Sequence, residues 1–131
     1  MKYLALIYSD EGAWEALSDD ERTQFYADYL AFSEAGRKAG VVLGGDELEP
    51  VRNATTVRLR DQQTVVSDGP YAETKEALGG YYLLECASLE EAVEWAARIP
   101  GAAHGAVEVR QVHVDEDEEP AAADERVEVA S

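Results

Sequence analysis

The chain is poor in cysteine, histidine and cationic residues. Cys86 is the only cysteine among 131 residues, so no internal disulfide can form, and its apolar surroundings predict a buried thiol. Lys and Arg number 11 against 28 Asp and Glu, which gives a formal net charge of −17 at pH 7. Nucleic acid and membrane surfaces bind proteins through a basic face, so neither is expected as a partner.

Long hydrophobic runs and targeting signals are also missing. The first residues, MKYLALIYSDE, hold a six-residue apolar run that is too short for a signal peptide and is followed by no small-residue cleavage site. No segment approaches the ~18 apolar residues of a membrane span. We therefore expect a cytoplasmic protein.

The charge is distributed unevenly along the chain. Residues 115–131 hold eight carboxylates and one arginine, and they contain too few apolar residues to form a core, which predicts a disordered acidic tail. Residues 1–114 carry a net charge of −10 and have the length of one domain.

Two capping-box patterns predict two helices. Ser18 and Glu21 form the first, in which each side chain can bond the other residue's backbone N–H. The helix that follows has an apolar stripe and ends near Gly40; the stripe consists of Phe25, Tyr29, Phe32 and Gly36. Ser88 and Glu91 form the second capping box. The residues expected on the apolar side of that helix are Leu89, Ala92, Val93, Ala96 and Ile99.

Alternating or apolar segments predict the strands. They are residues 2–8, 41–43, 54–60, 64–67, 80–85 and 106–114, with Gly44-Gly45 ending or bulging the second one. Thr55, Val57 and Leu59 should face one way in the third strand, and the residues between them the other way. Helices between strands indicate an α+β fold with a ferredoxin-like split βαβ, an antiparallel sheet and both helices on one face. A second copy would cover the other face, so a homodimer is expected.

Residues 68–76 read DGPYAETKE, and this segment resembles the signature of the YCII-related family, in its DGPF-domain branch. The segments KYLALIY, GVVLGGDEL, LGGYYLLE, EAVEWAARIP and VEVRQV extend the resemblance over residues 1–114. The resemblance implies a dimeric α/β barrel with a cleft between sheet and helices. It also implies a link to extracytoplasmic-function sigma factors, and hence a regulatory protein partner.

The resemblance does not carry a catalytic pair to this chain. In the broader family, a histidine of the first helix and an aspartate have been suggested to act together. This sequence has no histidine between Ser18 and Gly40, so that pair has no counterpart here.

Asp68 is the strongest candidate site residue. Asp-Gly-Pro forms a turn by its own chemistry, so a pinned loop explains Asp68 as well as a role as carboxylate base or ligand anchor does. The charged residues that follow, Glu73, Lys75 and Glu76, could orient a polar ligand or form a solvated surface. The predicted ligand-binding residues are Tyr71, Glu73, Lys75, Glu76 and Tyr82.

Tyr8 and His104 complete the candidate catalytic set with Asp68. Tyr8 could donate its phenol proton at a cleft or be a buried tyrosine at the rim, and His104 could act as a base or be an exposed loop residue. His104 and His113 lack the spacing and the cysteine partners of a metal site. The glycine pairs lack a dinucleotide fingerprint, so neither metal nor cofactor is expected.

Two functions from different classes follow. The first is a small-molecule-binding or accessory module, in which Tyr8, Asp68, Tyr71 and residues 73–76 wall a cleft for a small polar or aromatic ligand. The second is a cofactor-independent enzyme that uses Asp68 as general acid or base, by analogy with other proteins of this fold.

Overall fold

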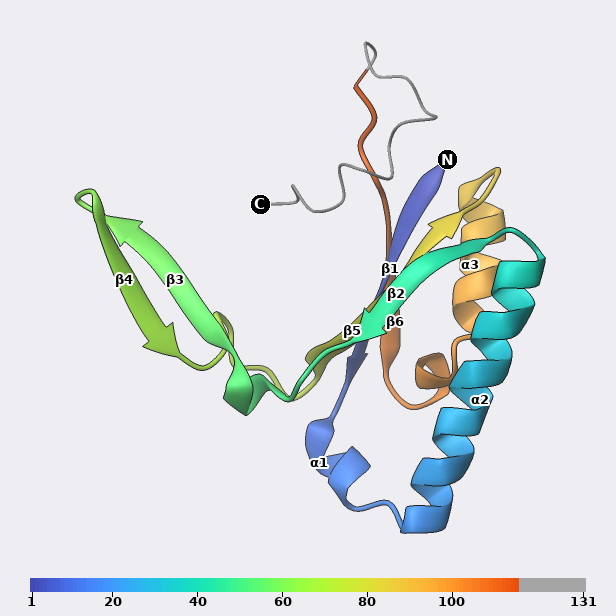
Figure 1. Ribbon diagram of the computed structural model, residues 1–131, viewed down its shortest axis with the longest axis horizontal. Helices are drawn as coiled ribbons and strands as arrows, with labels where there is room; N and C mark the ends of the chain where they lie inside the picture. The colour runs from blue at the N-terminus through green and yellow to red at the C-terminus, as the bar shows by residue number, and fades with distance from the viewer. Residues whose placement is uncertain (116–131) are drawn as a thin grey trace.

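The computed structural model describes residues 1–115, so the predicted tail lies outside the described residues except for Asp115 (Figure 1). The helices and strands follow in the order β1 (Lys2–Ser9), α1 (Glu11–Glu15), α2 (Asp19–Lys38), β2 (Val42–Glu47), η1 (Val51–Asn53), β3 (Thr55–Arg60), β4 (Gln63–Asp68), β5 (Ala77–Glu85), α3 (Leu89–Ala97), η2 (Pro100–Ala103) and β6 (Ala106–Gln111).

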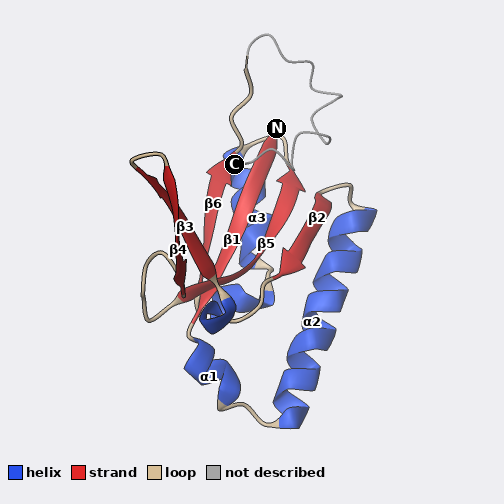
Figure 2. Cartoon of the chain, turned by 60° about the vertical axis from the view of Figure 1, so that its left-hand side comes forward, coloured by secondary structure: helices blue, strands red, loops and turns tan. Residues whose placement is uncertain are grey.

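Four of the strands form one antiparallel sheet with the order β2-β5-β1-β6. Helices α2 and α3 cover the same face of this sheet, and the opposite face carries no helix (Figures 1 and 2). This arrangement confirms the predicted α+β, ferredoxin-like class.

The core lies between the sheet and the two helices. Alternate residues of β1 are buried on the helix side, namely Tyr3, Ala5 and Ile7, while the residues between them are only half-buried. Cys86 is buried in the same core, as predicted. The period-two pattern of β1 therefore gives the sheet a covered face and an open face.

Helix α2 begins at the predicted capping box. The Ser18 hydroxyl accepts from the Glu21 N–H at 3.1 Å, and the Glu21 carboxylate accepts from the Ser18 N–H at 2.9 Å. Gly36 is buried where the helix crosses β2. The close approach requires a glycine, because a side chain at this position would overlap Val42. Gly40, with a φ of 75°, turns the chain into the next strand.

Helix α3 differs from the prediction in two details. Glu91 accepts from the N–H of Ala87 instead of that of Ser88, so only half of the second capping box forms. Leu89 and Val93 are 52% and 50% exposed, which makes their assignment to the apolar side wrong. The helix instead packs through small residues, namely Ala92 and Ala96, with Trp95 and Ile99 beside them.

Strand boundaries also differ from the prediction. Of the two alternatives predicted for Gly44-Gly45, strand β2 does not end there but continues to Glu47, and a register shift between Val42 and Gly44 agrees with the bulge. Strand β6 ends at Gln111, three residues before the predicted end. The short helix α1 was not expected; Asp10 caps it by accepting from the Gly12 N–H at 2.9 Å.

Strands β3 and β4 form a separate two-stranded hairpin (Figure 1). Its turn residues, Asp61 and Gln62, have φ values of 49° and 66°, as a tight hairpin turn requires. Within residues 1–115, none of the helices combines the length and the apolar content needed to cross a bilayer.

The substitution Gly36→Ala should destabilise the fold. In most helix interiors this change stabilises by up to about 1 kcal/mol, but here the new Cβ would lie 3.0 Å from Val42 Cβ and closer still to Val42 Cγ2. We expect this overpacking to outweigh the gain in helix propensity and to lower the free energy of unfolding, measured in urea, by about 1–3 kcal/mol. In a Val42→Ala background, which removes the overlap with Cγ2 and keeps the 3.0 Å contact with Cβ, the same change should cost less than in the wild type. A more stable Gly36→Ala single variant would contradict the close packing.

Candidate functional site

A cleft of about 680 Å³ lies between the N-terminal half of α2 and the helix-facing side of the sheet. Helix α1 and the loop after it close one end, and residues from β2, β5 and η2 complete the wall. The cleft therefore draws its lining from segments spread between Ile7 and His104 in the sequence.

Glycines form part of the floor of the cleft. Gly80 of β5 pairs with Ile7 of β1 and with Glu47 of β2, and Gly45 of β2 pairs with Tyr82 of β5. Ile7 is buried toward the helices, so Gly80 occupies a helix-facing position where most residues would project a side chain. The missing side chains leave space between the sheet and α2.

Aromatic rings form the roof of the cleft. Trp14 of α1 meets Phe25 and Tyr26 of α2 edge-on, with ring centroids 5.5 and 5.4 Å apart. Phe25 also lies 5.4 Å from Tyr29 and 5.3 Å from the ring of His104. These contacts are in the range of favourable aromatic pairs, so the rings hold one another in place.

Hydroxyl groups line the inner part of the cleft. The Ser33 and Tyr82 hydroxyls are 2.8 Å apart and hydrogen-bonded. The Gly101 N–H donates to the Tyr29 hydroxyl at 3.1 Å and ties α2 to η2. Burial raises the pKa of Tyr29 to about 12, although the hydrogen bond from Gly101 opposes the shift. The pKa of Tyr26 is also raised, first by burial and then by the nearby Glu47 carboxylate.

Acidic residues dominate the charge of the lining. Three are fixed by backbone N–H groups: Asp10 accepts from Gly12 at 2.9 Å, Glu11 from Val51 at 3.0 Å and Glu21 from Ser18 at 2.9 Å. The basic residues of the lining are Arg37 and His104. The acidic residues of the lining are Asp10, Glu11, Glu15, Glu21, Asp28, Asp46 and Glu47. The cleft therefore has a negative electrostatic potential.

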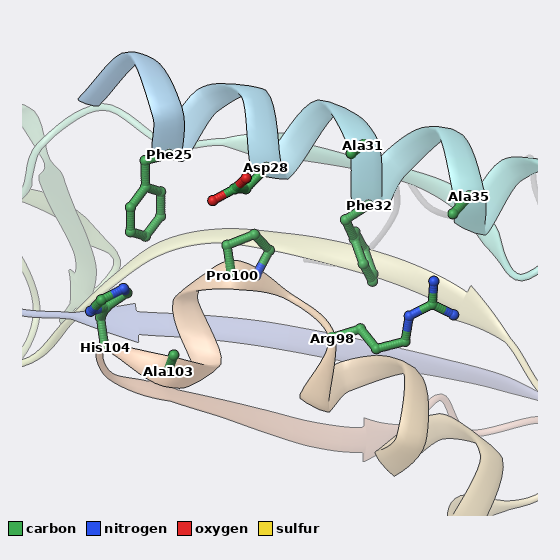
Figure 3. Close-up of a pocket in the computed structure, with 9 residues that line it drawn as sticks. All are labelled: Phe25, Asp28, Ala31, Phe32, Ala35, Arg98, Pro100, Ala103 and His104. Carbon is green, nitrogen blue, oxygen red and sulfur yellow. The ribbon is translucent and has the colours of Figure 1, made fainter. Parts of the chain in front are cut away.

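A second, more open hollow of about 620 Å³ lies between α2 and the segment from Arg98 to His104 (Figure 3). Phe25, Asp28 and His104 line both this hollow and the cleft. Phe25 and His104 point toward each other from α2 and from the end of η2 (Figure 3). These two rings thus form part of the wall between the two spaces.

The structure brings two of the predicted site residues, Tyr82 and His104, into the cleft. The other six lie elsewhere. Asp68 is the exposed last residue of β4, and Tyr8 is half-buried near the end of β1. The other four, which are exposed in the loop between β4 and β5, are Tyr71, Glu73, Lys75 and Glu76. Among the described residues, none of these six lines the cleft. The roles predicted for all eight residues stay predictions.

The Asp-Gly-Pro segment is held at the base of the β3–β4 hairpin. Gly69, with a φ of 97°, donates its N–H to the Ala54 carbonyl at 2.8 Å, and the Thr56 hydroxyl donates to the Gly69 carbonyl at 2.8 Å. The Arg58 guanidinium lies 4.8 Å above the ring of Tyr71. These contacts give the motif a structural role in fixing the hairpin and the loop after it.

Several lining residues were not predicted from the sequence. Phe25 and Tyr29 were placed on an apolar stripe and given no role in a site, although the N-terminal half of that stripe faces the cleft. Trp14 lies on the unexpected helix α1, and Glu47 lies beyond the predicted end of its strand. Within residues 1–115, no group of three or more His, Cys, Asp or Glu side chains is placed to hold a metal ion.

The raised pKa of Tyr29 predicts a pH-dependent contribution to stability. A phenol with a pKa of 10.0 when unfolded and about 12 when folded favours the folded state below pH 10, and this contribution is lost as the pH rises toward 12. Between about pH 9 and pH 11, Tyr29→Phe should therefore lose less unfolding free energy than the wild type in urea titrations. Tyr71→Phe, at an exposed tyrosine, controls for the loss of a phenol. Equal losses in Tyr29→Phe and the wild type would contradict the prediction.

Comparisons with known proteins place the chain in a family. The chain is 39% identical over 112 residues to an uncharacterized protein of Rhizobium meliloti (strain 1021), covering 84% of this chain and 90% of that protein. The solved structure of 5-chloro-2-hydroxyhydroquinone dehydrochlorinase (TftG) from Burkholderia phenoliruptrix AC1100, in complex with 2,5-dihydroxybenzoquinone, has a similar fold. It superimposes with a TM-score of 0.51 at 17% identity and covers 91% of this chain and 100% of that chain. The model of the YCII-related domain matches residues 1–114, and the chain belongs to this family.

Proposed function

We propose that this chain binds a small planar ligand, neutral or cationic, in the cleft between α2 and the sheet. The observation that carries the proposal is the combination of an aromatic roof with an acidic lining. The cleft volume of about 680 Å³ lies within the ~300–1,000 Å³ range of small-molecule sites.

The aromatic residues favour a planar ligand. Exposed ring faces and edges of Trp14, Phe25 and Tyr26 offer stacking and edge-on contacts, and such rings also attract a cation placed over their faces. The hydroxyls of Ser33 and Tyr82 add a hydrogen-bonding pair at the inner end. A flat ring with one or two polar substituents would satisfy both parts of the cleft.

The charge of the lining disfavours an anionic ligand. Seven acidic residues surround the space, and Arg37 is the one Lys or Arg among the lining residues described. A ligand carboxylate or phosphate would be desolvated against this negative potential with little compensation. A ligand ammonium group, in contrast, could pair with the carboxylates of Glu47 or Asp28.

The similarity in fold supports a ring-shaped ligand. The dehydrochlorinase structure holds 2,5-dihydroxybenzoquinone, a small six-membered ring. At 17% identity the likeness extends to the fold alone. It therefore supports a ligand of about the size of one ring, and the binding experiment below addresses its chemistry.

We also propose that the protein is a homodimer that buries the open face of its sheet. The centre of that face consists of Leu4 and Leu6 of β1 beside Leu83 of β5, all half-buried in the single chain. Glu108 and Arg110 form an ion pair on β6 at its edge, with a distance of 2.7 Å. An apolar centre with a charged rim is typical of a protein–protein interface.

Catalysis in the same cleft is the second candidate. The observation in its favour is that His104, a side-chain type common in general acid–base catalysis, lies in the wall of the cleft. A predicted role for Asp68 as general acid or base would require it to reach a substrate from outside this lining. Turnover of a bound compound, as opposed to its recovery unchanged, separates an enzyme from a binding module. A regulatory protein partner stays a prediction from the family.

Three probes with one ring system and different charges test the ligand proposal. We expect tryptamine and indole to bind, and indole-3-acetate to bind about tenfold more weakly than tryptamine, which corresponds to about 1.4 kcal/mol. Glu47→Gln should reduce this difference in calorimetric titrations, while Glu73→Gln, outside the cleft, should leave it unchanged. A preference for the anion, or binding of none of the three at millimolar concentration, would refute the proposal.

Light scattering at micromolar concentration tests the homodimer. We expect a dimer for the wild type and a monomer for Leu6→Lys, because a charge on the open face would be buried without a partner. Leu30→Lys, at a residue of α2 that is 60% exposed, is the matched control and should remain dimeric. Circular dichroism checks that both variants fold. A monomeric wild type would exclude the dimer and leave the ligand proposal untouched.

A further inference from the structure

The β3–β4 hairpin stands apart from the rest of the domain. Its strands pair with each other over Thr55–Arg60 and Gln63–Asp68 and, within residues 1–115, with no strand of the main sheet. It projects on the side of the main sheet that faces away from α2 and α3 (Figures 1 and 2). A lone two-stranded hairpin is marginally stable in water, so this one needs a further contact.

The two faces of the hairpin differ in chemistry. Directly paired residues share a face, so the pair Val57 and Val66 lies on the same side as Leu59. These three side chains are 63%, 61% and 66% exposed, respectively. Arg58 and Val65 lie on the opposite face, where Arg58 also packs on Tyr71. One face thus presents an apolar stripe to solvent, and the other is tied to the chain's own loop.

The hairpin carries no net charge of its own. Residues 55–68 hold two arginines, Arg58 and Arg60, and two aspartates, Asp61 and Asp68. Both arginines lie on the face opposite Val57, Leu59 and Val66, so the apolar stripe offers a second copy an apolar contact and no charge attraction.

We propose that the hairpin is an intersubunit arm that packs its Val57–Leu59–Val66 face against a second copy of this chain. The inference rests on the proposed homodimer. A partner that covers the open face of the sheet must lie on the side from which the arm projects (Figure 1), so the arm and the open face contact the same partner. The arm covers its apolar stripe in this way, while Arg58 on its other face stays packed on Tyr71 of its own chain.

The arrangement assigns a place to the segment DGPYAETKE. Asp68 ends the arm, and residues 69–76 follow directly, with Gly69 bonded to Ala54 at the arm's base. The segment therefore lies at the boundary between the two subunits. Its charged residues, Glu73, Lys75 and Glu76, are available to contact the partner.

Two adjacent valines on opposite faces provide a matched test. Val66→Lys places a charge on the apolar stripe, and Val65→Lys places the same charge on the other face. We expect Val66→Lys to weaken dimerisation at least about tenfold in sedimentation measurements across a concentration series, and Val65→Lys to change it less than about threefold. Circular dichroism and the thermal unfolding of the main domain verify that both variants are folded.

Hydrogen exchange gives a second, independent readout. Amides of residues 55–68 in the wild type should exchange more slowly at concentrations that favour the dimer than at dilution. A Val66→Lys variant that dimerises like the wild type, together with concentration-independent exchange, would overturn the arm while the homodimer stands. A wild type that stays monomeric at all concentrations would overturn both.

Discussion

The fold depends on a sheet that has helices on only one of its faces. Strand β1, between β5 and β6, shows this most clearly, because its side chains alternate between the buried core and a half-buried open face. The helix side creates the space in which the cleft forms. The open side leaves an apolar surface that the single chain does not cover. Both proposed activities, ligand binding and self-association, therefore follow from the same one-sided layering.

The cleft exists because α2 packs closely on the sheet along only one half of its length. Near its C-terminal half, α2 lies close enough to β2 for Gly36 to touch Val42. Near its N-terminal half, the sheet offers Gly80 and Gly45 instead of larger residues, and α2 presents Phe25 and Tyr29. The same helix is thus packed at one end and separated from the sheet at the other.

Local patterns predicted most of the fold but little of the site. The capping residue Ser18 and the alternation in β1 act over a few neighbouring residues, so their structural consequences are visible in the sequence. The exposure of Leu89 and Val93 depends on where α3 meets the sheet, which periodicity alone does not determine. The cleft joins segments from β1 to η2, and the residues that meet there have no fixed spacing. Helix α1 is five residues long and too short to show a period.

The segment DGPYAETKE shows how a distinctive motif can lie outside the cleft and still shape the molecule. Gly69 and Thr56 connect it to the base of the arm, and Tyr71 packs beneath Arg58. A hairpin that projects from a domain can keep one orientation only if its base is rigid, because small rotations there produce large displacements at its tip. Backbone hydrogen bonds at a glycine with positive φ restrict those rotations. An arm needs a fixed direction to contact a partner. The turn at Gly69 holds the base of the arm, and the proposed intersubunit contact depends on the direction that this turn sets.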